Sequence, residues 1–92
     1  MKQEIPVINN VDNNLFLSNE QTIHHQPDKI LIDFKSVYPQ FIGEQSIMVV
    51  NHRVILLDLY NAKGFLKALE ENINNYEKKF GKIRKPEAIV KA

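Results

Sequence analysis

The residues of this chain best suited to metal or acid–base chemistry are three histidines and two aspartates. His24 and His25 are adjacent, His52 lies far from them, and Asp28 and Asp33 follow the pair. Neighbouring side chains on a strand point to opposite faces, so His24 and His25 would share a metal ion only if the chain turned there. The aspartates are not at a recognised ligand spacing. We therefore expect surface or turn histidines, with no bound metal and no cofactor.

Asp33 and Arg53 form the second candidate, because each is a charged residue flanked by apolar residues in a strand pattern. A charge in the middle of a strand normally requires a partner. If the two strands are neighbours, these side chains form either a recognition or catalytic pair, or a structural salt bridge that fixes the strand register. We favour the salt bridge. We assign His52, beside Arg53, to a sheet edge or an interface rather than to a catalytic dyad.

The sequence patterns of the common enzyme classes are missing from the chain. There is no Ser/His/Asp order and no Walker-type sequence. The three glycines are far apart and form no loop that would hold a phosphate. We therefore predict that the protein is not an enzyme.

The charge is distributed unevenly although the formal net charge is only +1. Residues 1–76 carry six Lys or Arg against nine Asp or Glu, and residues 77–92 carry six against two. This basic end either contacts phosphate groups, as in nucleic acid, or is a solvated tail with cations favoured by the negative end of a helix dipole. The candidate nucleic-acid contacts are Lys78, Lys79, Lys82, Arg84 and Lys85.

Size and composition indicate one small domain. A chain of 92 residues has room for a single core, and a core of that size is marginally stable without a partner. Cysteine is absent, no apolar run is long enough to span a bilayer, and the N-terminus has no signal-peptide core. We expect a cytoplasmic protein without a membrane segment.

One amphipathic helix is predicted near the C-terminus, from about Leu59 to Phe80. Asp58 is suited to the N-cap, and Gly81 to a left-handed residue that ends the helix. Phe65 widens the apolar face of this helix. The other apolar positions recur at spacings of 4, 3, 4, 3 and 4 residues: Ala62, Leu66, Leu69, Ile73, Tyr76 and Phe80.

Strands are predicted upstream of the helix, weakly in residues 15–23 and clearly in residues 29–37 and 46–57. Pro39 and Gly43 bracket a loop, and the polar residues 51–53 mark either a continuous strand or a bulge. The fold class is thus α+β, a small antiparallel meander of about three strands followed by one long C-terminal amphipathic helix. Residues 14–83 form the domain and residues 84–92 a basic tail. Residues 1–13 are flexible or form an edge strand, which Pro6 restricts to the edge.

The long strand offers apolar side chains on both faces, and one helix covers only one of them. Contiguous apolar patches on a soluble protein usually mark an interface. A symmetric homodimer is the simplest way to cover the second face. The candidate interface residues are Met48, Val50, Val54, Leu56, Ile73 and Tyr76.

The helix segment resembles the C-terminal signature of the small prokaryotic family DUF3467, a domain of unknown function. The resemblance covers about residues 17–83. It departs from the family pattern at Leu17, in a longer segment between Pro39 and Arg53, and at the start of the helix. It implies this fold and supplies no active site. The matching positions are Ser18, Asn19, His25, Asp33, Phe34, Pro39, Arg53, Ala62, Lys63, Leu66–Leu69, Asn72, Ile73, Tyr76, Glu77, Phe80, Gly81 and Ile83.

Two functions follow as expectations. The first is a non-enzymatic interaction module, a homodimeric subunit or adaptor with an unidentified protein partner. The alternative is a protein associated with nucleic acid or ribonucleoprotein, which docks through its basic C-terminal end.

Overall fold

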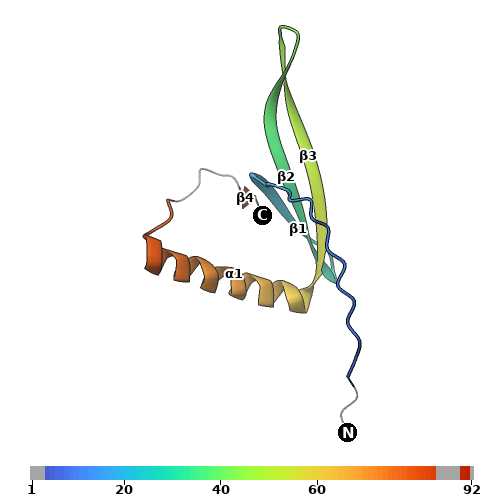
Figure 1. The fold of residues 1–92 in the computed structure, drawn as a ribbon, viewed down its shortest axis with the longest axis vertical. Coiled ribbons are helices and arrows are strands. Elements are labelled where there is room, and N and C mark those ends of the chain that lie inside the picture. The colour runs from blue at the N-terminus through green and yellow to red at the C-terminus, as the bar shows by residue number, and fades with distance from the viewer. Residues whose placement is uncertain (1–3, 85–89, 92) are drawn as a thin grey trace.

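A computed structural model describes residues 4–84 and 90–91 of the chain (Figure 1). The predicted α+β fold is confirmed: three antiparallel strands are followed by one long helix. A short strand in the C-terminal tail, which the sequence analysis did not predict, pairs in parallel with the first strand and gives the sheet order β3-β2-β1-β4. The elements are β1 (Glu20–His25), β2 (Lys29–Ile42), β3 (Gln45–Asp58), α1 (Leu59–Phe80) and β4 (Val90–Lys91).

Strands β2 and β3 form one long hairpin that extends beyond the rest of the sheet (Figure 1). Two residues, Gly43 and Glu44, connect them, and Gly43 has φ +62°, as two-residue hairpin turns require. β1 pairs only as far as Lys35 of β2. We call residues 29–36 and 51–58 the base of the hairpin, and residues 37–42 and 45–50 the arm.

The arm replaces the predicted loop between Pro39 and Gly43, which was wrong. Proline is tolerated in a strand where its missing N–H faces a free edge. The backbone of Lys35 and Val37 bonds towards Asn19, on the side of β1. By the alternation of an antiparallel ladder, the nitrogen of Pro39 faces the same way, beyond the end of β1. Pro39 therefore removes no hydrogen bond to β3.

The polar residues in the middle of β3 form no bulge. Pairing with β2 runs without interruption from Lys29 opposite Asp58 to Ile42 opposite Gln45. Side chains consequently alternate between two faces along the whole strand. The inner face, which α1 approaches, carries Ile32 and Ile55, and the outer face carries Asp33 and His52.

The helix begins and ends at the predicted residues. The two carboxylate oxygens of Asp58 accept hydrogen bonds from the backbone N and side-chain Nδ2 of Asn61, at 2.8 and 2.7 Å. Gly81 has φ 101° and ψ 167°, so it is not in the predicted left-handed helical region but in an extended region accessible essentially only to glycine. Beyond it, the backbone N of Ile83 donates to Oε2 of Glu77 at 2.8 Å, which folds the chain back on the last turn.

A packed core is almost absent from the single chain. Among the residues for which burial is described, only Ile32, at 7% exposure, is buried. The radius of gyration is 18.1 Å, whereas a compact domain of this length has about 12 Å. Residues 4–19 form neither helix nor strand, so no edge strand lies at residues 5–8. Within the described residues, no helix is long and apolar enough to cross a membrane.

Candidate functional site

The middle of the outer face holds a histidine–carboxylate pair. His52 of β3 lies diagonally across from Asp33 of β2, and its Nδ1 is 3.0 Å from each carboxylate oxygen. The Asp33 side chain is 20% exposed and that of His52 is 50% exposed. The carboxylate orients the imidazole ring, which is accessible to solvent.

A second polar pair lies next to the first on the same face. Nζ of Lys35 donates to Oγ1 of Thr22 at 2.8 Å. Lys35 is directly opposite His52, and Thr22 is directly opposite Asp33. Thr22 and Lys35 were not predicted as a pair, because their proximity depends on the strand register. Each of the two pairs connects neighbouring strands and stabilises the register at the centre of the base.

The predicted salt bridge between Asp33 and Arg53 does not form. Arg53 is opposite Phe34, so it lies on the inner face, whereas Asp33 is on the outer face. The Arg53 guanidinium carbon instead lies 5.2 Å from the centre of the Phe16 ring, a cation–π contact with the N-terminal segment. Adjacent residues of a strand lie on opposite faces. Asp33 therefore pairs with His52, the residue next to the predicted partner Arg53.

The side chains of the two adjacent histidines lie on opposite faces of the sheet. His24 is opposite Leu31 and His25 is opposite Ile30, so their side chains lie on opposite faces at the end of β1. Both are exposed. The described residues contain no group of three or more His, Cys, Asp or Glu side chains arranged to hold a metal ion.

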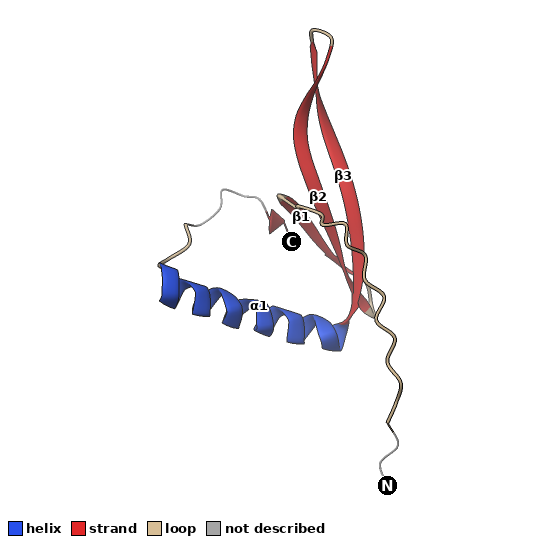
Figure 2. Cartoon of the chain, in the orientation of Figure 1, coloured by secondary structure: helices blue, strands red, loops and turns tan. Residues whose placement is uncertain are grey.

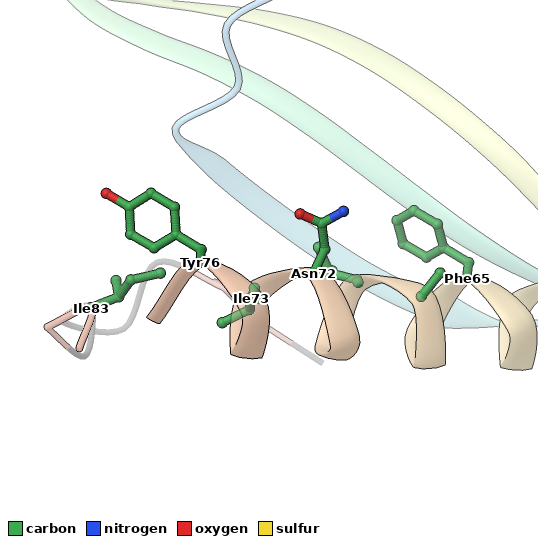
Figure 3. Close-up of a pocket in the computed structure, with 7 residues that line it drawn as sticks. Phe65, Asn72, Ile73, Tyr76 and Ile83 are labelled. Carbon is green, nitrogen blue, oxygen red and sulfur yellow. The ribbon is translucent and has the colours of Figure 1, made fainter. Parts of the chain in front are cut away.

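An apolar concave surface lies between α1 and the inner face. One groove of about 520 Å³ is formed by the N-terminal half of α1 with Ile30, Ile32 and Leu57. A second hollow of about 430 Å³ follows the rest of the helix (Figure 3). Phe65, Asn72, Ile73, Tyr76 and Ile83 are among the residues that line this second hollow. Apolar side chains form most of the lining of both hollows, which suits them to packing.

The predicted interface residues lie on two separate surfaces. Ile73 and Tyr76 line the hollow along α1. The other four are exposed on the outer face of β3, on the opposite side of the sheet from the helix. One continuous interface therefore does not include all six. The four residues on β3 are Met48, Val50, Val54 and Leu56.

The basic end is exposed at the tip of α1. Lys78, Lys79, Lys82 and Arg84 are all accessible, and Nζ of Lys79 lies 5.2 Å from the centre of the Phe80 ring. Lys78 and Lys82 line a shallow hollow of about 340 Å³ together with Glu77 and Asn74. The fifth predicted contact, Lys85, lies outside the described residues.

Comparisons with known proteins identify a family and no individual relative. No curated protein and no solved structure matches the chain. A family model described as "Protein of unknown function (DUF3467)" matches residues 8–85, which include the three antiparallel strands and all of α1. The expected resemblance is thereby confirmed, and the chain belongs to the DUF3467 family.

Proposed function

We propose that this protein is a non-enzymatic interaction module that forms a homodimer and serves as a subunit or adaptor of a larger complex. The observation that carries the proposal is the exposure of its apolar side chains. Phe41, Met48 and Leu66 are each more than 60% exposed, and Ile32 is the one buried side chain among the described residues. A chain that folds stably has to cover such residues, and a second protomer supplies the missing surface.

The accessible surface shows how much more area the single chain exposes than a compact monomer of its mass. It is 8994 Å², whereas a folded monomer of 10.7 kDa exposes about 5,500 Å². Residues 4–19, which form neither helix nor strand, contribute part of the difference, and the whole of it is several times the ~800 Å² that each partner contributes to a standard interface. An obligate dimer with an extensive apolar interface fits this surface better than a weak, transient contact.

The mass of the purified protein tests the proposal. Light scattering at micromolar protomer concentration should give about twice the 10.7 kDa of the protomer. The dimer should dissociate and unfold together on dilution, because neither half has a core of its own. A mass near 10.7 kDa with cooperative unfolding would show that the protomer covers its own apolar surface, and the proposal would fail.

One charged substitution on each exposed apolar surface tests which of the two surfaces forms the dimer interface. Val54→Asp places a carboxylate on the outer face of β3, and Ile73→Asp places one in the hollow along α1. The substitution that lies in the dimer interface should lower the measured mass towards that of the protomer. Asn75→Asp adds the same charge to an exposed position on α1 and serves as the control.

If the protein is a cytoplasmic adaptor, its binding to a partner protein should require the dimer. We place the protein in the cytoplasm because the chain has no cysteine, as is common where disulfides do not form. Affinity capture from the native cell should recover a partner with the wild-type protein. Its loss with the dimer-breaking variant, and its retention with Asn75→Asp, would connect partner binding to the dimer.

A second candidate function is nucleic-acid binding through the tip of α1. Lys78, Lys79, Lys82 and Arg84 are exposed together there, and a dimer presents two such clusters. Binding to single-stranded RNA should weaken steeply with salt and fall when these four residues are replaced by Gln. Replacing Lys63 and Lys67 by Gln is the control. Absence of binding at low salt would exclude this candidate.

A further inference from the structure

The outer edge of β3 is long and unpaired. β3 is the end strand of the sheet and has 14 residues, without proline or lysine, two residues that commonly protect edges. Figure 2 shows α1 leaving β3 beneath the sheet, away from this edge. The N-terminal segment contacts Arg53 through Phe16, and β2 is the one strand among the described residues that pairs with β3.

The hairpin turn determines which residues face this edge. Ile42 and Gln45 flank the two-residue turn, where the pair exchanges both backbone hydrogen bonds. Alternation from that point directs the odd-numbered residues of β3 to β2 and the even-numbered residues outwards. The bonds of Lys35 and Val37 towards Asn19 fit the same alternation on β2. The outward-facing residues are Ser46, Met48, Val50, His52, Val54, Leu56 and Asp58.

The polarity of the side chains along β3 is symmetric about His52. Residues at equal distances on either side of His52 match in polarity on both faces of the strand. Because an antiparallel pair of identical strands places such residues opposite one another, every apolar residue would meet an apolar residue. The outer-face pairs are Val50 with Val54, Met48 with Leu56 and Ser46 with Asp58; the inner-face pairs are Asn51 with Arg53, Val49 with Ile55 and Ile47 with Leu57.

The neighbouring registers lack this match. Pairing centred on Asn51 would place His52 opposite Val50, and Arg53 opposite Val49. Pairing centred on Arg53 would place Met48 opposite Asp58. Both registers set charged or polar groups against apolar ones on an exposed edge.

We propose that two copies of the chain join through antiparallel pairing of β3 with β3, with the two-fold axis at His52. This inference rests on the proposed homodimer and names the backbone contact through which the two copies join. The two sheets become one continuous sheet, and the arm of each copy lies beside the base of the other. Each arm thereby gains a third strand, which a two-stranded ribbon needs for stability.

Cysteine pairs test the register, because the chain has no cysteine of its own. Asn51 and the Arg53 position of the second copy form a non-hydrogen-bonded pair, with Cα atoms about 4.5 Å apart, which a disulfide bridges. Asn51→Cys and Arg53→Cys proteins are mixed, allowed to exchange subunits and oxidised mildly. We expect covalent heterodimer to form at least several-fold faster in the mixture than in either variant alone, where the thiols lie diagonally at about 7–8 Å.

The wild-type protein gives a second measurement that no substitution disturbs. The amides of Val50 and Val54 face the outer edge, so in the dimer they should exchange with solvent as slowly as those of Val49 and Ile55. Rapid exchange of Val50 and Val54 in a protein of dimer mass would overturn this inference while the homodimer stands. If either cysteine variant alone cross-linked as fast as the mixture of the two, the register centred on His52 would be wrong. A protomer mass would remove both proposals.

Discussion

The base and the arm of the hairpin belong to one continuous ladder and have different surroundings. In the base, β1 pairs with β2, α1 approaches the inner face, and Ile32 is buried. In the arm, two strands stand alone, and Phe41 and Met48 remain 73% and 64% exposed. Both halves alternate apolar residues on a continuous ladder. The burial of Ile32 therefore depends on β1 and α1, neighbours that the arm lacks.

The arm gains its stability from a second copy of the chain in the proposed dimer. A two-stranded ribbon is marginally stable in water, so the arm gains little free energy within one chain. In the proposed dimer, residues 46–50 of each arm lie beside residues 54–58 of the other base. The better-supported half of one chain would then stabilise the weaker half of the other. Substitutions in the base should therefore cost more stability than comparable substitutions in the arm.

Removing the buried side chain of the base should have the largest effect. Ile32→Ala deletes apolar atoms and leaves a cavity, so the free energy of unfolding should fall by about 2–4 kcal/mol. Ile42→Ala makes the same change at the exposed end of the arm, where about 0.5 kcal/mol or less is expected. Urea unfolding at one fixed protomer concentration measures both. Equal losses would mean that the arm is as buried in solution as the base.

The elements that the sequence predicted correctly are those with local determinants. The ends of α1 follow from Asp58, whose carboxylate bonds Asn61, and from Gly81, whose φ of 101° favours glycine. Both depend on residues within one turn. The prediction from Pro39 was wrong. Pro39 indicated a loop, whereas β2 continues through this residue to Ile42. Its tolerance depends on where β1 ends, which is information from another strand.

The candidate site shows the same limit. The alternation of β2 and β3 placed Asp33 and Arg53 correctly within their strands, but the predicted pair needed a register in which both share a face. The register is set at the turn by Gly43 and Glu44, and the sequence analysis placed a longer loop there. With that turn known, His52 follows as the partner of Asp33. Thr22 and Lys35 follow from the same register.

The junction between base and arm should show the second effect. The Asn19 side chain accepts from Val37 N at 2.9 Å and donates to Val37 O at 2.8 Å, which continues the β1 pairing by one step. Asn19→Ala removes both hydrogen bonds and should lower the free energy of unfolding by about 1–2 kcal/mol. Amide exchange should quicken at Val37 more than at Ile32. Asn19→Asp keeps the acceptor alone and should give an intermediate loss.

The turn at the end of the arm should show a smaller effect. Gly43 has φ +62°, and a Cβ added there would meet no atom within 4 Å, so only backbone strain opposes a side chain. Gly43→Ala should cost about 1 kcal/mol. Gly43→Asn should cost less, since asparagine tolerates this conformation. The faster amide exchange should be confined to the arm, and a change that spreads to the base would show that the two halves unfold as one.

The smallest effect should show whether α1 belongs with the base. Gly64 lies within the helix, and an added Cβ has open space around it, so Gly64→Ala should stabilise the helix by about 0.5–1 kcal/mol. Because Asp58 is both the last residue of β3 and the N-cap of α1, this gain should raise the thermal midpoint and slow exchange at Ile32, but not in the arm. Gly81→Ala, the same change at φ 101°, should lower the midpoint instead. An unchanged midpoint for Gly64→Ala would mean that the helix melts independently of the base.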